Sequence, residues 1–357
     1  MKKKELPLPK YQMVKDYVLL QIKKKKIGKD GRIPSESEFS KTLDVSSITV
    51  RKAMAELVNE GIIYRVRGKG SFVVGKESEI NNFPSYVTLI IDGNEIYDNS
   101  YMQIIKGIQS YLSLKNCKLV IEFIEKNFEQ EQKLILKLIQ SDNHGLLIYS
   151  RNPNAAKVYL KEIRKKSIPF VMLDRIPSGY AVNCITSNNH DGAYGAVQYL
   201  IEQGHHHIGF IACDFHLSTE VERFNGYRQA ILDASLVLNN ESLFFKRVLD
   251  YNKLLAQIKK EKLTALFCAN DRRALDVIER LEMLGVNIPE QISIMGFDDF
   301  ESSKFARVPL STVMQDFAAL GYEAAKLLLE SYHVPSHNYK KVLLSTELII
   351  RESTRKI

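Results

Sequence analysis

The sequence has 357 residues, of which 45% are hydrophobic, and a formal net charge of +8. This length exceeds that of an ordinary single domain, and no apolar run approaches the ~20 residues that a membrane-spanning helix needs. The four cysteines are far apart and form no Cys-x-x-Cys pair, so they fit a reducing cytoplasm better than a disulfide framework or a zinc site. We therefore expect a cytoplasmic protein with more than one domain.

The positive charge is concentrated in the first part of the chain. Residues 1–76 hold 18 Lys and Arg against 8 Asp and Glu, a net of +10, which leaves a net of −2 for the rest of the chain. Such asymmetry indicates a small nucleic-acid-binding module attached to a larger, near-neutral domain. We expect the module at residues 1–75, a polar linker at 76–85 and the larger domain at 86–357.

Two helices are predicted at the start of the basic module. Apolar side chains at helical spacing run through Tyr11–Lys26, and the lysine-rich end of this segment suits the C-terminal end of a helix dipole. The residues SESE after Pro34 match a capping box, so a second helix should begin at Ser35 and run to about Leu43.

A third helix and a hairpin should follow a short turn. Ser46 or Ser47 can cap a helix with one apolar face, whose exposed N-terminal end could enter the major groove of DNA. Gly61 should end this helix, and the β-rich segments Ile62–Val66 and Ser71–Val74 flank a tip, RGKG, whose cations can reach phosphates. This order of elements predicts a winged helix-turn-helix domain that binds double-stranded DNA. A solvated basic helical domain is the alternative.

The segments IPSESEF, DVSSITVRKAMAELVNEGII and GKGSFV resemble the winged-helix domain of the GntR family of bacterial transcription regulators. The resemblance implies DNA contacts from the first helix, the start of the second, the recognition helix and the wing. These contacts correspond here to Tyr11, Ser35, Ser47, Thr49, Arg51, Lys52, Gly68, Lys69 and Gly70. The family commonly has Arg where this chain has Ser37 and Ser47, so a bidentate contact to guanine is missing at each place.

From about Tyr86 the sequence alternates short β-branched runs with amphipathic helical segments. The predicted strands are Val87–Ile91, Lys118–Phe123, Gly145–Tyr149, Pro169–Leu173, Ile208–Ala212, Thr264–Cys268 and Ile292–Met295. This rhythm predicts an α/β fold in which helices cover both faces of parallel sheets. Ligands bind such folds beyond the C-terminal ends of the strands.

Polar residues follow several of these strands. They are Asp92, Tyr149–Arg151, Asp174, Arg175, Asp214, Asn270, Asp271, Asp298 and Asp299. The set suits a polyhydroxylated ligand, although an Asp after a strand often only caps the next helix. Because neighbours in an extended segment point to opposite sides, only one of Asp298 and Asp299 should face the cleft.

No catalytic motif accompanies these loops. The sequence has no Gly-x-Ser-x-Gly elbow, no P-loop and no His-Glu-x-x-His, and the run His205–His207 would not place three ligands on one side. We expect no catalytic residue, no metal and no cofactor. An α/β enzyme with a nucleic-acid tether and a transport-type sugar-binding protein are the weaker alternatives.

Several strings in the larger domain, among them CITSNNHDGAYGAVQYLIEQG, ERFNGYRQAI, TALFCAND and IMGFDDF, resemble the effector-binding core of the LacI/GalR regulators. That core is similar to periplasmic sugar-binding proteins, with two Rossmann-like subdomains. Matching motifs imply that the effector is bound by Tyr101, Asp174, Arg175, Arg223, Asn270, Asp271, Asp298 and Gln315.

Joined to a GntR-type head, this core resembles the arabinose-repressor family of Gram-positive bacteria. The resemblance implies a homodimeric repressor of carbohydrate-utilisation genes that a small sugar, such as arabinose, releases from its DNA operator. The sequence departs from that family around Asp92–Ser100 and Tyr149–Asn152. A different sugar, a sugar phosphate or a nucleobase therefore stays open as the effector.

Overall fold

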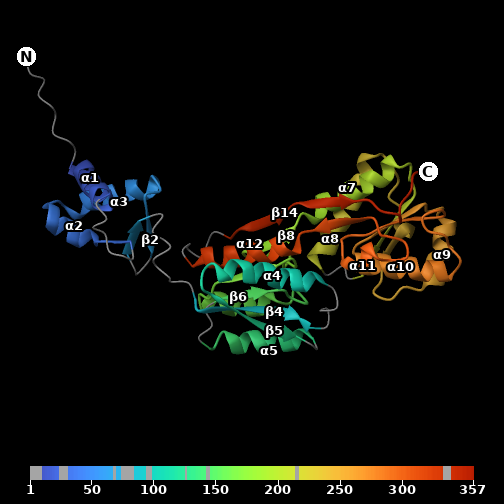
Figure 1. Cartoon of the computed structure of the whole chain (residues 1–357), viewed down its shortest axis with the longest axis horizontal. Helices are drawn as coiled ribbons and strands as arrows, with labels where there is room; N and C mark the ends of the chain where they lie inside the picture. Colours follow the sequence, from blue (N-terminus) through green and yellow to red (C-terminus); the bar gives the residue numbers. More distant parts are fainter. Residues whose placement is uncertain are drawn as a thin grey trace, which may run out of the picture. The chain divides into compact units, whose positions relative to one another are not determined.

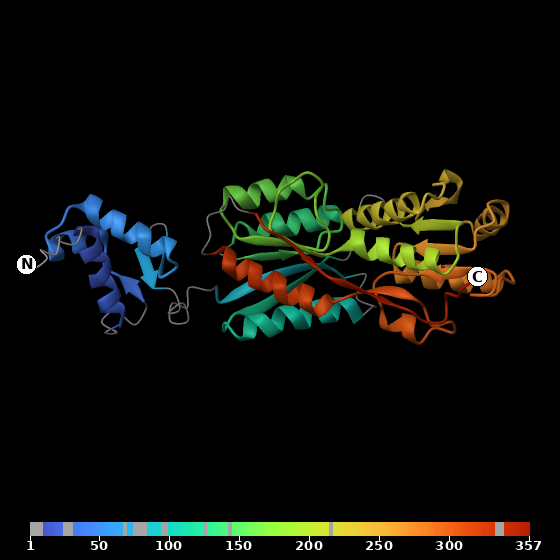
Figure 2. The ribbon, with the colours of Figure 1, turned by 90° about the horizontal axis from the view of Figure 1, so that it is seen from above.

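The computed structural model of the protein describes residues 10–23, 31–66, 70–73, 84–93, 99–124, 127–141, 145–213, 217–332 and 339–357. The chain forms two compact units, Met1–Phe83 and Pro84–Ile357, drawn in Figures 1 and 2. Gly68 and Lys69 of the expected wing tip, Asp214, and residues 76–83 of the expected linker lie outside the described residues.

The first unit is a three-helix domain with a small antiparallel sheet. Its elements are α1 (Lys10–Lys23), β1 (Arg32–Ile33), α2 (Glu36–Leu43), α3 (Ser47–Asn59), β2 (Ile63–Val66) and β3 (Gly70–Val73). The sheet has the order β1-β3-β2. The sequence did not predict β1, because two residues carry no periodic signal and depend on β3 for their pairing.

Side-chain caps fix where the second and third helices of this unit begin. The predicted capping box is present, since the Ser35 hydroxyl accepts from the Glu38 backbone N–H and the Ser35 N–H donates to the Glu38 carboxylate at 2.6 Å. Ser46 caps α3 by accepting from the Thr49 N–H at 3.2 Å. Val50 and Leu57 of α3 are fully buried in the core of the unit.

The second unit contains two lobes, each built on a parallel sheet. The sheet of the first lobe has the order β14-β8-β7-β6-β4-β5. Its strands are β4 (Tyr86–Asp92), β5 (Lys118–Ile124), β6 (Leu146–Ile148), β7 (Phe170–Leu173), β8 (Cys184–Ser187) and β14 (Lys341–Leu344). Figure 1 shows α4 (Asn99–Ser113) and α12 (Phe317–Ser331) on one face and α5 (Phe128–Leu138) on the other, where α6 (Lys157–Lys165) packs beside α5.

The second lobe repeats this arrangement on a four-stranded sheet of order β10-β9-β11-β12. The strands are β9 (Ile208–Ala212), β10 (Leu243–Phe245), β11 (Ala265–Cys268) and β12 (Ser293–Met295). One apolar cluster joins the sheet to α7 (Asn189–Glu202) and α8 (Ser218–Asp233), and another joins it to α9 (Tyr251–Lys260) and α10 (Asp271–Met283). The short elements η3 (Asn240–Ser242) and α11 (Glu301–Lys304) lie in connections.

The chain passes between the two lobes three times. It leaves the first sheet after β8 to enter α7, and it returns from β13 (Thr312–Gln315) into α12. It leaves again after β14 to form β15 (Thr346–Ile349), which pairs antiparallel with β13. Neither lobe is therefore a continuous segment of sequence, and the three connections can act together as a hinge.

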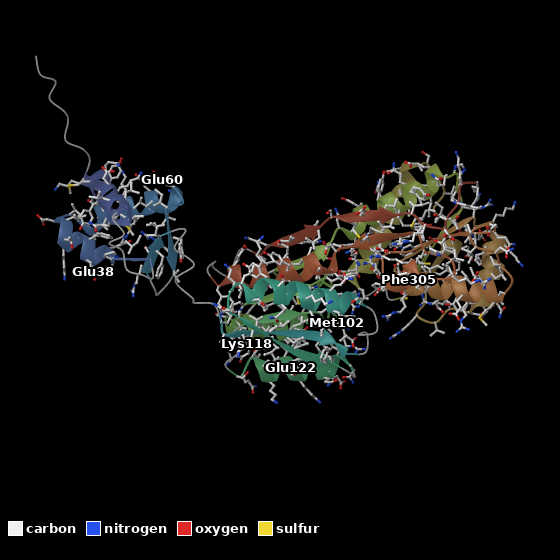
Figure 3. All side chains as sticks on the ribbon, in the orientation of Figure 1. Glu38, Glu60, Met102, Lys118, Glu122 and Phe305 are labelled. Carbon is white, nitrogen blue, oxygen red and sulfur yellow. The ribbon has the colours of Figure 1, made fainter. Side chains whose placement is uncertain are left out.

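All seven strands predicted from the sequence are present in the second unit, with ends shifted by at most one residue. The predicted α/β class is confirmed. The strand β5 forms one edge of the first sheet, and Figure 3 shows the side chains of Lys118 and Glu122 along it. Among the described residues, no helix is both long and apolar enough to cross a membrane.

Candidate functional site

The exposed face of the first unit carries most of the residues expected to contact DNA. In α3 the side chains of Ser47, Arg51 and Lys52 are exposed, whereas Thr49 is half-buried. The Thr49 hydroxyl lies 2.8 Å from that of Ser46, so it takes part in capping the helix. The start of the recognition helix is thus ordered by its own side chains.

Two cations of the recognition helix are held by residues from other elements. Arg51 donates to the Glu36 carboxylate at 3.3 Å, and Arg65 of β2 donates to the same carboxylate at 2.9 Å. The Lys52 ammonium lies 4.2 Å from the centre of the Tyr11 ring, which brings these two predicted residues together. Because exposed ion pairs contribute little, Arg51 can exchange Glu36 for a phosphate or a base.

The other residues expected to contact DNA are Ser35 at the start of α2 and the residues of the wing, of which the structure describes only Gly70. Ser35 is exposed at the start of α2, and its hydroxyl lies 3.0 Å from that of Ser37. Gly70 begins β3 with a φ of 114°, a conformation that favours glycine. Gly68 and Lys69 stay predictions outside the described residues.

The second unit has a cleft of about 810 Å³ between its lobes. Seven of the eight residues expected to bind an effector line it: Tyr101, Asp174, Arg175, Arg223, Asn270, Asp298 and Gln315. These side chains come from both lobes, mostly from loops at the C-terminal ends of strands. This is the place where open parallel sheets bind ligands.

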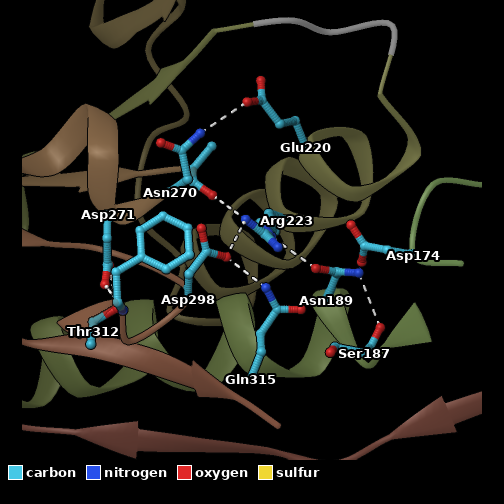
Figure 4. Close-up of polar contacts among 12 residues, drawn as sticks. Asp174, Ser187, Asn189, Glu220, Arg223, Asn270, Asp271, Asp298, Thr312 and Gln315 are labelled. Atoms are coloured by element: carbon cyan, nitrogen blue, oxygen red, sulfur yellow. Dashed lines mark hydrogen bonds and ion pairs between the residues drawn. The ribbon is translucent and has the colours of Figure 1, made fainter. Parts of the chain in front are cut away.

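The centre of the cleft is a network around Arg223, a buried residue of α8 (Figure 4). Its guanidinium donates to Asn189 at 2.8 Å and lies 3.2 Å from the Asp298 carboxylate. Gln315 donates to the same carboxylate at 2.6 Å. Burial raises the pKa of Asp298, and the positive charge of Arg223 opposes that rise.

Two buried acceptors in the cleft have no hydrogen-bond partner among the described residues. Asp174 accepts the Tyr149 hydroxyl with one carboxylate oxygen, at 3.0 Å, and its Oδ1 has no partner. The amide Oε1 of Gln315 has none either. Buried polar atoms are nearly always paired, so both oxygens suit a ligand that donates hydrogen bonds.

The eighth predicted residue, Asp271, does not line the cleft. Its carboxylate is fully buried and accepts from the backbone N–H of Phe300 at 3.0 Å and the hydroxyls of Ser303 and Thr312. Burial raises the pKa of Asp271 to about 6. The structure therefore places this carboxylate beneath the loop that carries Asp298, where it supports the loop.

Asp298 and Asp299 point in different directions, as the sequence predicted. Asp298 lines the cleft, whereas Asp299 forms ion pairs with Arg351 at 2.6 Å and Lys304 at 3.3 Å. The predicted reason was wrong, because the segment is not extended. Both residues have positive φ angles, 127° and 58°, so a tight turn separates their side chains.

Several charged residues that line the cleft were not among the eight expected effector contacts, although Asp92 and Arg151 were among the polar residues noted after predicted strands. Arg151 forms an ion pair with Asp92 at 2.8 Å in the first lobe. In the second lobe, Glu220 accepts from the Cys213 N–H at 2.9 Å and from Asn270 at 3.3 Å. Further residues of this kind are Arg247, Arg272, Arg273 and Asp276. Arg151 and Asp92 follow predicted strands, which was the available signal.

Two family models match the chain. One is described as bacterial regulatory proteins of the gntR family and matches residues 10–73, and the other is described as a periplasmic binding protein-like domain and matches residues 197–354. These matches confirm the predicted winged-helix head and the predicted periplasmic-binding-protein-like core.

Known proteins resemble the chain over most or all of its length. The chain is 28% identical to the arabinose metabolism transcriptional repressor of Geobacillus stearothermophilus, over 99% of this chain and all of that protein. It is 29% identical to the transcriptional repressor PurR of Vibrio vulnificus, over 72% of this chain and 78% of that protein. The solved complex of the transcriptional regulator CelR with cellobiose aligns with a TM-score of 0.67 at 23% identity, over 87% of this chain and 91% of that one.

Proposed function

We propose that this chain, a gntR-family DNA-binding head followed by a periplasmic-binding-protein-like core, is a transcriptional repressor that a small carbohydrate releases from its operator. The observation that carries the proposal is the cleft of the core, in which polar side chains from both lobes surround two unpartnered buried acceptors. Sugar hydroxyls can donate to these acceptors and accept from the neighbouring arginine and amide groups. The similarity to a repressor of arabinose metabolism over the whole chain makes arabinose and its derivatives the first candidates.

The switch requires that the effector favour one arrangement of the lobes. A ligand held by residues of both lobes closes the cleft, and closure changes DNA affinity only if the open and closed states bind DNA differently. The three connections between the lobes allow such a rotation. We propose that the protein acts as a homodimer, so that closure alters the spacing of two heads on a two-fold symmetric operator.

The buried cysteines support the proposed cytoplasmic location. Cys117 and Cys184 are buried free thiols, and burial raises the pKa of each to about 11. They stay protonated and unreactive at neutral pH, as expected of apolar core residues. All four cysteines are unpaired in the structure.

A nucleobase is the alternative effector that the resemblance to the LacI/GalR core leaves open. The aromatic residues of the cleft offer a nucleobase little surface for stacking, because their rings contact one another. The rings of Phe300 and Phe317 stack on each other, and those of Tyr101 and Tyr149 meet edge to face at 5.4 Å. The relatives named above are transcriptional regulators, so they give no support to the enzyme alternative.

The proposal is tested by selecting operator DNA with the full-length protein from random duplexes and then adding candidate effectors to the complex. We expect one enriched sequence and release of the protein by a carbohydrate. Arg51→Ala should weaken operator binding by ~1–3 kcal/mol, which is about 5- to 150-fold, without changing effector binding. A protein that enriches no sequence would contradict the proposed function.

The effector site is tested by Arg223→Ala, which should keep operator binding and lose release by the effector. Because the substitution leaves Asp298 buried without its cation, the variant's thermal midpoint should be measured in parallel. Arg228→Ala is the control, since Arg228 lies on α8 in the same lobe, is exposed and does not line the cleft. Unchanged release in a folded Arg223→Ala variant would refute this assignment.

A further inference from the structure

We infer that the effector is an anionic carbohydrate, a polyhydroxylated molecule with a phosphate or carboxylate group, and that Arg247 and Arg272 hold its anionic group. The inference rests on the proposed function and specifies the ligand of the same cleft. It follows from the number of arginines in the cleft, the position of these two and the unpartnered acceptors of Asp174 and Gln315.

Arginines outnumber carboxylates among the residues that line the cleft. Six arginines line it together with five carboxylates. Three arginines are already matched within 3.3 Å by cleft carboxylates, as Arg151 with Asp92, Arg223 with Asp298 and Arg273 with Asp276. The two remaining carboxylates also have protein donors, since Asp174 accepts from Tyr149 and Glu220 from Cys213 and Asn270.

Arg247 and Arg272 lie together at the N-terminal end of α10. The Arg273 guanidinium donates to the backbone carbonyl of Arg247 at 2.7 Å, which ties the loop after β10 to the first turn of the helix. Arg272 is the second residue of α10, and both side chains are exposed where they line the cleft. No hydrogen bond or ion pair of the Arg247 guanidinium is found within the described part of the chain.

The N-terminal end of this helix adds to the attraction for an anion. Helix α10 has 13 residues, and the partial positive charge at its start favours phosphate and carboxylate groups. Guanidinium groups bind both anions through paired hydrogen bonds. The second lobe therefore offers an anion a helix end and two cations at the same place.

The unpartnered acceptors show that an anion alone would not satisfy the cleft. Oδ1 of Asp174 and Oε1 of Gln315 are buried and need hydrogen-bond donors, which inorganic phosphate supplies poorly at neutral pH. A sugar phosphate or a sugar acid carries hydroxyl donors and an anionic group in one molecule. Both parts of the site are then used.

The test compares matched pairs of ligands by thermal shift and calorimetry on the full-length protein. Each pair is a neutral sugar and its phosphate, or a neutral sugar and its acid, such as arabinose with arabinose 5-phosphate and glucose with gluconate. Inorganic phosphate is the control for an anion without a carbon skeleton. We expect only an anionic member to raise the midpoint, with the two kinds of pair distinguishing phosphate from carboxylate.

Variants then locate the anion. The double substitution Arg247→Gln and Arg272→Gln should weaken binding of the anionic ligand by roughly tenfold or more, because it removes charge-assisted hydrogen bonds. Arg228→Gln, on the exposed side of α8 and outside the cleft, should leave the affinity unchanged. A neutral sugar that binds wild type and the double variant equally and releases the operator would overturn this inference and leave the proposed function intact. If inorganic phosphate reproduced the full shift, the carbohydrate part of the inference would be wrong.

A different observation supports a second inference, on the DNA-binding head. We propose that Ile48 contacts the methyl group of a thymine in the operator. Ile48 is the second residue of α3 and is 78% exposed, although isoleucine is among the residues most often buried in proteins. Covering such a side chain on binding is favourable because it removes apolar surface from water.

At the start of α3, Ile48 is the side chain that can recognise a base through apolar contact. Ser47 has a short hydroxyl, and Thr49 is engaged with the cap residue Ser46. Arg51 contacts Glu36 on a neighbouring helix. In the major groove of DNA, the 5-methyl group of thymine is the apolar group that a side chain can recognise.

Replacing thymine with uracil removes only this methyl group and so tests the contact directly. In the operator selected with the full-length protein, each thymine is replaced singly. We expect one position in each half-site at which uracil weakens wild-type binding several-fold and does not further weaken binding by Ile48→Ala. Met13→Ala, at an exposed apolar residue of α1, should keep the full uracil effect.

The outcomes separate this inference from the function on which it depends. If uracil at every position costs wild type and Ile48→Ala the same factor, Ile48 reads no methyl group and the inference is overturned. If no duplex is enriched at all, the DNA-binding function itself fails. The substitution should not unfold the head, because the side chain is exposed and alanine favours helix.

Discussion

The adjacent residues Asn270 and Asp271 have different roles, because one side chain lines the cleft and the other is buried in the interior. Asn270 caps α10 and lines the cleft, where its amide donates to Glu220. The Asp271 carboxylate points the other way and accepts three hydrogen bonds in the interior. We therefore propose that Asp271 acts on the effector only by supporting the turn that carries Asp298.

Asp271 should make stability depend on pH. Its pKa rises from 3.8 to about 6 on folding, so the native state binds a proton that the unfolded state releases between these two values. The carboxyl group therefore adds stability as pH falls through about 6, and this contribution is complete below about 4 and absent at neutral pH. In Asp271→Asn, the thermal midpoint should gain less than wild type does between pH 7 and pH 5. Parallel curves for the two proteins would contradict the prediction.

The buried Glu131 holds a loop of the cleft from behind. It accepts from the Ser150 hydroxyl at 2.6 Å, the Tyr159 hydroxyl at 2.5 Å and the backbone N–H of Arg151 at 2.9 Å. Burial raises the pKa of its carboxyl group. Glu131 is thus placed to position Tyr149 and Arg151 without touching a ligand.

Glu131→Ala should weaken effector binding and lower the thermal midpoint, because it leaves the buried hydroxyls of Ser150 and Tyr159 without an acceptor, at a cost of about 1–3 kcal/mol. Glu131→Gln should keep most of the affinity, since its amide oxygen can accept from Arg151 while its amide nitrogen donates to the two hydroxyls. Calorimetry with the effector found in the screen measures the difference. Equal affinity in the alanine variant and wild type would show that the loop does not depend on Glu131.

The positions after predicted strands located part of the candidate site, and the resemblance to the LacI/GalR core added Tyr101, Arg223 and Gln315. Neither showed which side chains contact one another. Asp174 and Arg175 follow a predicted strand, so the topology of the fold placed them. Which of Asn270 and Asp271 faces the cleft depends on the first turn of α10, and no periodicity encodes that. Arg247 lies in an irregular loop after β10 and is brought to the cleft by a contact with Arg273, which is distant in sequence.

Two glycines set how closely α4 and α12 pack in the first lobe. A Cβ atom on Gly107 would lie 2.0 Å from the carbonyl oxygen of Ala318, and one on Gly321 would lie 2.1 Å from that of Ile104. The backbones of the helices therefore meet where neither has a side chain. In the sequence, these glycines interrupt helical segments without any sign that they face one another.

Gly107→Ala should lower the thermal midpoint by roughly 2–10 °C, because the added methyl group forces the two helices apart. Gly195→Ala is the matched control, since Gly195 also lies inside a helix, α7, and a Cβ atom there would contact nothing within 4 Å. Alanine at that position should stabilise the protein by up to about 1 kcal/mol. Scanning calorimetry of both variants decides the point, and two midpoints that shift alike would refute the close contact.

The sequence predicted the positions of the strands far better than it predicted which strands pair. Short β-branched runs in the sequence identified β4 and β9 to within one residue of their ends. The return of β14 to the edge of the first sheet, beside β8, leaves no local pattern because it joins segments about 150 residues apart. The two Rossmann-like subdomains were accordingly expected from the resemblance alone, and the crossings between them were not predicted.

Across the whole molecule, the head and the core should be linked by a reciprocal free energy. If the effector lowers operator affinity by a given factor, operator DNA must lower effector affinity by the same factor, which is typically about 5- to 150-fold. Titrating the effector into the protein with and without a saturating operator duplex measures this factor. If the effector releases the protein from DNA but its affinity is the same with and without operator, release is not a binding equilibrium.

Because neither lobe is a continuous segment, the effector-binding core can fold completely only late in synthesis. The head leaves the ribosome first and can fold at once, whereas the first lobe receives α12 and β14 only after the whole second lobe has been made. A message broken off between the end of the head and residue 341 therefore yields a DNA-binding head on an incomplete effector-binding core. Such a fragment keeps the surface that binds DNA but lacks the folded cleft through which an effector would act.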